Sequence, residues 1–173
     1  MRDAVVLASE LAVVDGLLRA EIDPGQAIEI KAGDLWRYSQ RGMRRVVRLD
    51  IESAIRRNPR VRQRYCAMLA AHADAASDVA IAASDADHMT RVVGPLKLSI
   101  VRDGGDAFLL VSVADPSAAI PESIEFVGAS GVARIDLQHM VRGHFQLRLV
   151  PTDPALSEIA ALMQDPNTQV FLL

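Results

Sequence analysis

The sequence predicts an α+β protein, in which a helical N-terminal part is followed by a small antiparallel β-sandwich or sheet carrying one short helix. Two patterns indicate this. Before residue 75, apolar residues recur at three- and four-residue steps, as on one face of a helix. After residue 91, apolar and polar residues alternate, as in strands. We therefore predict a helical domain over 1–75, a linker over 76–92 and an antiparallel β domain over 93–173.

Composition limits the class of protein. The chain has 173 residues and half of them are hydrophobic, which is enough for one sizeable domain or two small ones. Abundant Ala and Arg, with only two Lys, give it the composition of a protein from a GC-rich bacterium. A single cysteine excludes an intramolecular disulfide, and no signal peptide or membrane-spanning stretch is evident. We expect a soluble, cytoplasmic protein.

The first predicted helix covers residues 3–20 and ends at the turn signal Asp23-Pro24-Gly25. Its apolar stripe recurs at heptad positions: Leu7, Leu11, Val14 and Leu18. This stripe is expected to pack against the other helices. A homodimer through this helix stays open as an alternative, although fewer than three heptads make an isolated coiled coil marginal.

A second helix is predicted over residues 35–41. Asp34 is expected to be its N-cap, because a carboxylate there can accept the free N–H groups of the next turn. Gly42 is expected to end the helix. Trp36 and Tyr38 are expected to anchor the core rather than to form a stacking platform.

Two more helices are predicted before the linker. The first covers 44–57 and ends at Asn58-Pro59, because the residue before a proline disfavours the helical conformation. Pro59 then suits the first turn of a helix over 60–73. The following stretch, rich in Ala, Asp and Ser, is interpreted as the beginning of the linker.

Short alternating segments predict about six strands in the C-terminal part. They cover residues 96–100, 108–113, 123–127, 132–137, 145–150 and 169–173. Asp103-Gly104-Gly105-Asp106 and Ala129-Ser130-Gly131 are typical of hairpin turns. Asp153-Pro154 indicates an N-cap followed by proline at the first helical position, so one short helix is expected to run from there to residue 165.

The strongest local feature is a run of arginines within residues 36–64. Ten arginines and two acidic residues give this segment a charge of +8, although the whole chain carries −3. The acidic chain, its pI of 5.8 and the absence of a base-reading or base-stacking motif favour an acidic protein as the partner. The residues predicted to bind this partner are Arg37, Arg41, Arg44, Arg45, Arg48, Arg56 and Arg57.

Two other interpretations of the arginines stay open. In the first, the arginines form a nucleic-acid-binding module, whose affinity for DNA or RNA falls steeply as the salt concentration rises. In the second, the arginines form a solvated helix face and are neutralised within the molecule by carboxylates of the acidic β part.

No motif in the sequence points to catalysis, a cofactor or a metal. The side chains that come nearest to a metal or acid–base site have no ligand-like spacing: His72, Asp85, Asp87, His88, His139 and His144. Cys66 lies close to an apolar helix face and is expected to be a buried structural thiol. We predict a non-enzymatic regulatory or adaptor protein without a cofactor. An enzyme whose site is assembled from residues distant in sequence is the third alternative.

The segment Asp34-Leu35-Trp36-Arg37-Tyr38 combines an acidic-Leu start with a following aromatic residue, and Gly42 supplies a break. Residues 54–62 continue with an apolar and proline rhythm. In these features the stretch 34–69 resembles the N-terminal helical domain of bacterial anti-sigma factors of the zinc-finger-like type. Ala54, Asn58 and Val61 stand where that family has its zinc ligands, so this chain would lack the zinc. The resemblance implies that the helical part masks a sigma factor and that the β part is a sensor or docking module.

Overall fold

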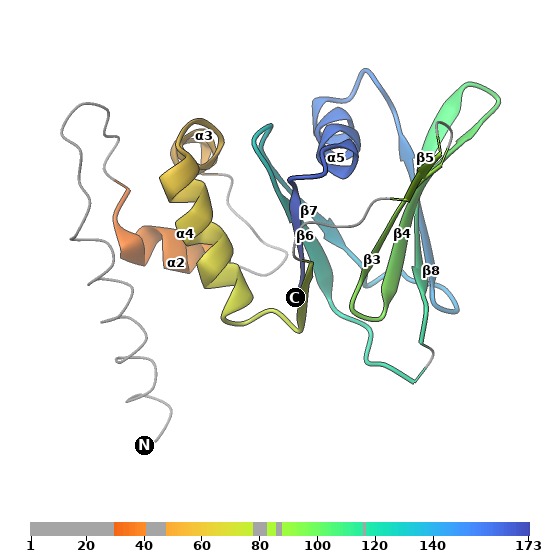
Figure 1. Cartoon of the computed structure of the whole chain (residues 1–173), viewed down its shortest axis with the longest axis horizontal. Helices are drawn as coiled ribbons and strands as arrows, with labels where there is room; N and C mark the ends of the chain where they lie inside the picture. Colours follow the sequence, from red (N-terminus) through yellow and green to blue (C-terminus); the bar gives the residue numbers. More distant parts are fainter. Residues whose placement is uncertain (1–29, 41–47, 78–82, 86–87, 116) are drawn as a thin grey trace. The chain divides into compact units, whose positions relative to one another are not determined.

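A computed structural model describes residues 30–40, 48–77, 83–85, 88–115 and 117–173 of the chain (Figure 1). It shows an α+β protein with helices and two antiparallel sheets, as predicted. The chain divides into two compact units, 1–51 and 52–173, and each is described by itself. The predicted helix over 3–20 and the arginines at 41, 44 and 45 lie outside the described residues.

Helix α2 (Ala32–Ser39), in the first unit, begins three residues before its predicted start. Asp34 is therefore not the N-cap, a position that Lys31 occupies. Instead its carboxylate lies in the first helical turn, where the positive end of the helix dipole favours negative charge. The helix buries Tyr38, as expected for a core anchor, whereas Trp36 is half-buried.

Helices α3 (Leu49–Arg57) and α4 (Pro59–Ala70) meet at Asn58, as predicted. The Asn58 side chain accepts a hydrogen bond from the Arg60 backbone N–H, and Pro59 fills the first helical position, whose N–H has no helical partner in any case. The end of α4 at Ala70 comes three residues before the predicted one. Of the predicted span 44–57, residues 44–47 lie outside the described residues and Arg48 precedes the helix.

The described strands form a four-stranded and a five-stranded antiparallel sheet. Sheet A has the order β1-β9-β6-β7, with β1 (Ala75–Ser77), β9 (Gln169–Leu172), β6 (Ser123–Val127) and β7 (Val132–Asp136). Sheet B has the order β2-β3-β4-β5-β8, with β2 (Ala83–Asp85), β3 (His88–Val93), β4 (Leu96–Asp103), β5 (Asp106–Val113) and β8 (His144–Leu149). All six predicted strands are present.

Three strands lie in or next to the segment 76–92, which the sequence predicts to be a linker. Strands β1 and β2 are short and rich in Ala and Ser, residues with little strand preference of their own. They are held as edge strands by the ladders of β9 and β3. Strand β3 pairs along its whole length with β4 through the hairpin at Gly94. The described residues of the predicted linker therefore belong to the sheets, with β1 in sheet A and β2 and β3 in sheet B.

The predicted hairpin turns are confirmed. Asp103 and Asp106 face each other across the β4–β5 ladder, which leaves a two-residue turn of Gly104 and Gly105. Both glycines have positive φ angles, 57° and 92°, the conformation that tight hairpins demand and that glycine adopts without strain. Strands β6 and β7 likewise pair from Val127 and Val132 outward.

The main core lies between the inner faces of the two sheets and includes helix α5 (Pro154–Gln164). Asp153 caps this helix by accepting hydrogen bonds from the N–H groups of Ala155 and Leu156, as its sequence predicts. The helix packs against β6, β7 and β8 and covers one end of the space between the sheets (Figure 1).

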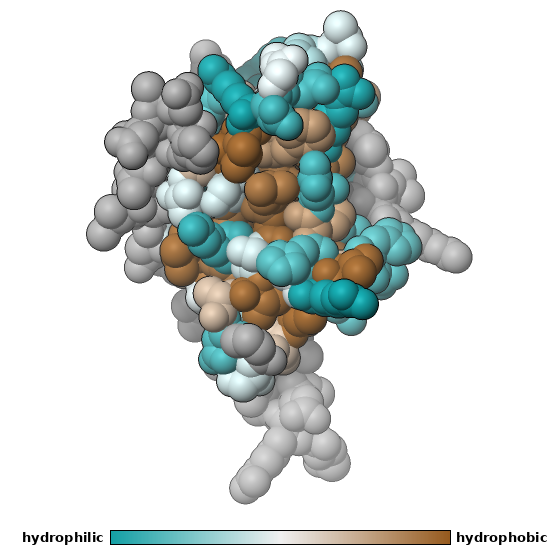
Figure 2. Space-filling view, turned by 90° about the vertical axis from the view of Figure 1, so that its right-hand side faces the viewer, coloured by the Kyte–Doolittle hydropathy of each residue, from teal (hydrophilic) through white to brown (hydrophobic). Residues whose placement is uncertain are grey.

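The two sheets differ in how their outer faces are covered. Every residue of β6 is buried, because the core covers one face of sheet A and α4 contacts the other. Figure 2 looks onto the outer face of sheet B, where apolar residues form a central strip between hydrophilic ones. No helix in the described part of the chain is long and apolar enough to cross a membrane.

Candidate partner-binding surface

The end of α3 and the start of α4 carry the arginines that the structure describes in the second unit. Between Glu52 and Asp74 the sequence contains five arginines and no acidic residue. Arg56, Arg57 and Arg60 are exposed. Arg62 and Arg64 are half-buried on α4. We call these five residues the arginine surface.

Arg62 has a structural role within this surface. Its guanidinium donates hydrogen bonds to the carbonyl oxygens of Ile55, at 3.2 Å, and Arg56, at 3.3 Å. Both carbonyls belong to the last turn of α3, where no helical N–H group is left to bind them. A cation near the C-terminus of α3 also interacts favourably with the negative end of the helix dipole. Arg62 therefore fixes the junction of α3 and α4.

Arg56 is partly neutralised inside the unit. Its guanidinium donates a 2.8 Å hydrogen bond to Glu158, on α5, while the Arg56 side chain stays 51% exposed. The β6–β7 hairpin packs against this ion pair, since a Cβ on Gly131 would lie 1.6 Å from Glu158 Oε1. Arg56 is thus a predicted binding residue that forms an internal ion pair with a carboxylate of the β part.

Arg57 and Arg64 have no hydrogen bond or ion pair anywhere in the described part of the chain. Arg57 is exposed and Arg64 is half-buried. These two residues are the part of the arginine surface whose charge has no such partner in the described residues, so it is available to a binding protein. Arg57 belongs to the predicted binding set, whereas Arg60 and Arg64 lie in the arginine run outside that set.

The predicted binding residues of the first unit have acidic neighbours in their own segment. Arg37 lies 3.6 Å from Asp34, one helical turn away, and both ends of this pair are in contact with solvent. Arg48 donates two hydrogen bonds to Asp50, of 2.9 and 2.7 Å. These hydrogen bonds lower the pKa of Asp50 to about 2 and raise the pKa of Arg48. Local pairing therefore offsets part of the positive charge here.

Helix α4 is attached to sheet A by a buried polar group. Glu125 lies in the middle of β6 and is fully buried. Tyr65, on α4, donates a hydrogen bond to one oxygen of the Glu125 carboxylate, and Arg134 of β7 lies 3.4 Å from the other. A buried carboxylate needs such partners because the protein interior solvates charge poorly. The arginine surface is thus carried by a helix with a fixed contact to the sheet.

Sequence reasoning missed Glu125, although a signal was available. It is the one charged residue in the otherwise apolar and small β6 sequence Ser-Ile-Glu-Phe-Val. A charge in a strand buried on both faces indicates a paired internal group rather than a surface position.

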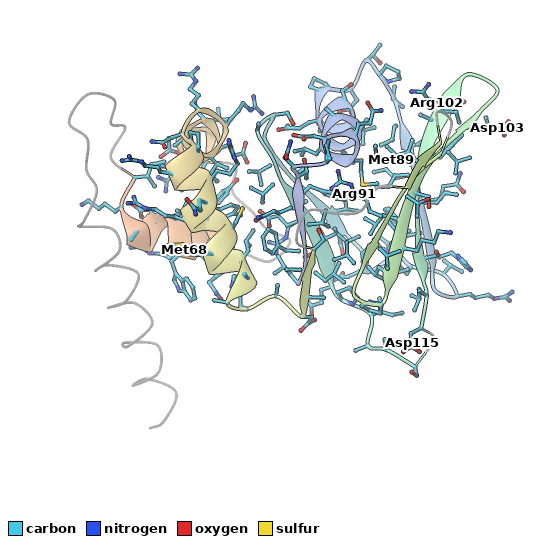
Figure 3. The ribbon with its side chains drawn as sticks, in the orientation of Figure 1. Met68, Met89, Arg91, Arg102, Asp103 and Asp115 are labelled. Atoms are coloured by element: carbon cyan, nitrogen blue, oxygen red, sulfur yellow. The ribbon has the colours of Figure 1, made fainter. Side chains whose placement is uncertain are left out.

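Arg91, on β3, is a second buried charge that the sequence did not reveal. Its side chain is fully buried and donates to three backbone carbonyls, those of Met163, Asp165 and Thr168. Met163 lies in the last turn of α5 and the other two residues follow the helix, and Figure 3 shows Arg91 pointing from β3 toward that helix. Burial lowers the Arg91 pKa, and the nearby Asp165 carboxylate counteracts this. The residue ties sheet B to the end of α5.

Cys66 is buried on α4, as predicted. Burial raises its pKa to about 12, and the nearby Glu125 charge acts in the same direction. Arg62 acts in the opposite direction but does not offset the burial. The thiol is therefore protonated at neutral pH and is a poor nucleophile, which fits a structural role.

The histidines and acids singled out in the sequence do not converge where they are described. No group of three or more His, Cys, Asp or Glu side chains in the described residues is arranged to hold a metal ion. His139 and His144 are exposed near the turn at Gly143, and His72 follows the end of α4. Asp87 and the side chains of Asp85 and His88 lie outside what the structure describes.

Comparison of the chain with protein-family models, with curated proteins and with solved structures finds no match.

Proposed function

We propose that this protein is a non-enzymatic regulatory or adaptor protein of the cytoplasm that binds an acidic protein through its arginines. The observation that carries the proposal is the arginine surface at the junction of α3 and α4. There, Arg57, Arg60 and Arg64 lie within a stretch of 21 residues, 53–73, that contains no carboxylate. Guanidinium groups on such a surface attract carboxylates and bind them with paired hydrogen bonds.

The charge distribution favours a protein over a nucleic acid as the partner. The whole chain carries −3 and residues 36–64 carry +8, so the remaining residues together carry −11. Proteins that bind nucleic acids through phosphates usually have a basic domain, whereas here the positive charge is confined to one segment. A local positive surface on an acidic protein steers one face toward an acidic partner.

The scaffold supports specific rather than diffuse binding. Arg62 fixes the junction of the two helices, and the contact between Tyr65 and Glu125 fixes α4 on sheet A. Because these contacts already order the backbone of α3 and α4, little further backbone entropy is lost when their side chains bind a partner. The resemblance of residues 34–69 to zinc-finger-like anti-sigma factors suggests a sigma factor as the partner, masked by the helical part of a chain that lacks the zinc ligands.

The experiment is an affinity capture from the native host, with the full chain as bait at low salt. We expect the wild type to retain one protein in stoichiometric amount and the variant Arg57→Glu/Arg64→Glu to lose it. Neither arginine has a hydrogen bond or ion pair among the residues that the structure describes, so the reversal of their charges should leave the fold intact. The matched control is Arg102→Glu, which reverses an exposed arginine at the β4–β5 hairpin.

Three results would overturn the proposal. The wild type captures no protein, the double variant captures the same protein equally well, or the control loses it as completely. A shift of labelled duplex DNA or single-stranded RNA at micromolar protein, with affinity that falls steeply as salt rises, would favour the nucleic-acid-binding alternative instead.

A further inference from the structure

The outer face of sheet B carries apolar residues at its centre. The inner residues of β4, β5 and β8 belong to the core or pack against it, so the alternate residues lie on the opposite face. Among these are Val101 on β4 and Phe108 and Leu110 on β5, none of which belongs to the core. Val92, on β3, lies on the same face and is 61% exposed. They account for the apolar strip in Figure 2.

The sequence of β5 is typical of a strand that is covered on both faces. It reads Asp-Ala-Phe-Leu-Leu-Val-Ser-Val, with a nearly continuous apolar run. A sheet with one solvated face instead alternates between apolar and polar residues, as its neighbour β8 does. Helix α4 covers the outer face of sheet A, but no described element of the second unit covers that of sheet B. The composition of β5 therefore indicates that something else covers this face.

The charges of this face are separated along the strands. Lys97 lies in the register row of Val92, Ser112 and His144 at one end. Asp103 and Asp106 lie at the other end, at the β4–β5 hairpin, where Figure 3 labels Asp103. Asp106 is already paired with Arg148 at 2.8 Å. One lysine and one aspartate thus stand at opposite ends of the apolar strip, about six residues or roughly 20 Å apart.

We infer that this face binds the same face of a second copy of the chain. A two-fold axis across the strands places the lysine end of one copy over the hairpin of the other. Lys97 then faces Asp103 of the partner subunit, twice in the dimer, and the apolar strips meet between these pairs. A two-fold axis along the strands would instead place like charges together, so the separation of charge selects the reversed arrangement.

The size of the face predicts a weak dimer. Four strands spaced by about 4.8 Å, each contributing about six residues of about 3.3 Å, span roughly 15 by 20 Å. This area, roughly 300 Å² per partner, is well below the about 800 Å² per partner of a standard specific interface, as expected of a transient contact. We expect a dissociation constant in the micromolar range, on the order of 10–100 µM.

The first test is sedimentation velocity of the full chain over a concentration series that brackets the expected dissociation constant. We expect the wild type to pass from monomer to dimer and Phe108→Ser/Leu110→Ser to stay monomeric. Ile120→Ser is the matched control, since Ile120 is 50% exposed and lies in the connection between β5 and β6 rather than in sheet B. A wild type that is monomeric throughout, or a serine variant that dimerises normally, would overturn the inference.

The second test identifies the orientation. We expect Lys97→Glu and Asp103→Lys each to weaken the dimer about ten-fold or more, because each brings like charges together twice. The double variant Lys97→Glu/Asp103→Lys should return to within about three-fold of the wild type, because the opposite charges face each other again. A double variant no better than the single ones would exclude the reversed arrangement. The variant Arg57→Glu/Arg64→Glu should dimerise normally, which separates this surface from the arginine surface.

Discussion

Among single residues, the buried charges Arg91 and Glu125 set this fold apart from a simple β-sandwich. Each lies on an interior strand of its sheet and binds a group from a helix or from the chain that follows a helix. Arg91 satisfies carbonyls at the end of α5, and Glu125 accepts a hydrogen bond from Tyr65 on α4. Both residues therefore join helices to sheets by interactions that depend on direction, which apolar contacts alone would not provide.

The contribution of Arg91 can be measured by its replacement with methionine. We predict that Arg91→Met lowers the free energy of unfolding by about 3 kcal/mol, because three buried carbonyls lose their donor. Urea denaturation of the full chain measures the change. The control Arg102→Met removes an exposed guanidinium and should remain within about 0.5 kcal/mol of the wild type. Equal stability of the two variants would show that the contacts of Arg91 contribute nothing specific.

The ion pair of Arg48 and Asp50 predicts a visible pH dependence. In the folded chain the pKa of Asp50 is about 2, against 3.8 without the pair. The stabilisation is therefore present above about pH 4 and is lost as the pH falls through about 2. An NMR titration of the Asp50 carboxyl carbon should show the low midpoint, and Arg48→Gln should return it toward 3.8. A midpoint near 3.8 in the wild type would contradict the pairing.

Single residues also show where the sequence was informative. The buried Cys66 was predicted from its place near an apolar helix face, and its thiol pKa of about 12 agrees with that position. Arg91 was missed because it falls in the segment interpreted as a linker, and Glu125 because a charged residue in a strand is normally on the solvent side. Their burial depends on partners 60 or more residues away, which local patterns do not contain.

At the scale of elements, helices with strong end signals were found at or near their true limits. Asn58-Pro59 and Asp153-Pro154 begin α4 and α5, because in each case a side-chain cap and a proline act together. Asp34 misled because a carboxylate is favourable both as an N-cap and within the first turn. Strands β1 and β2 escaped prediction because their ladders, rather than their Ala- and Ser-rich sequences, determine their conformation.

The cap of α5 provides a test at this scale. We predict that Asp153→Ala lowers the free energy of unfolding by about 1 kcal/mol, because two N–H groups of the first turn lose their acceptor. Asp153→Ser, which keeps a capping oxygen, should lose less than half as much. Thermal unfolding followed by circular dichroism compares the variants. An alanine variant as stable as the wild type would show that water replaces the cap without cost.

At the scale of the whole chain, sequence and structure agree on an α+β protein. The positive charge that the sequence concentrates in one segment lies largely at the surface in the described residues. The segment 36–64 carries +8, and the described arginines of α3 and α4 remain largely at the surface, with Arg56–Glu158 as the internal ion pair to the β part. One alternative open from the sequence was complete internal neutralisation, but within the described ranges no carboxylate pairs with Arg57 or Arg64. The run of arginines is visible in the sequence, whereas the structural roles of Arg56 and Arg62 depend on tertiary contacts.

The most direct test of the arginine surface is the affinity of the purified partner complex, measured by titration calorimetry. For the wild type we predict an affinity that falls as salt rises, because exposed charges are screened. Arg57→Glu/Arg64→Glu should weaken binding by a factor of about 100, the effect of losing roughly 2.7 kcal/mol, while Arg102→Glu stays within about two-fold. Unchanged affinity in the double variant, at low salt and with the fold intact, would contradict the assignment of this surface.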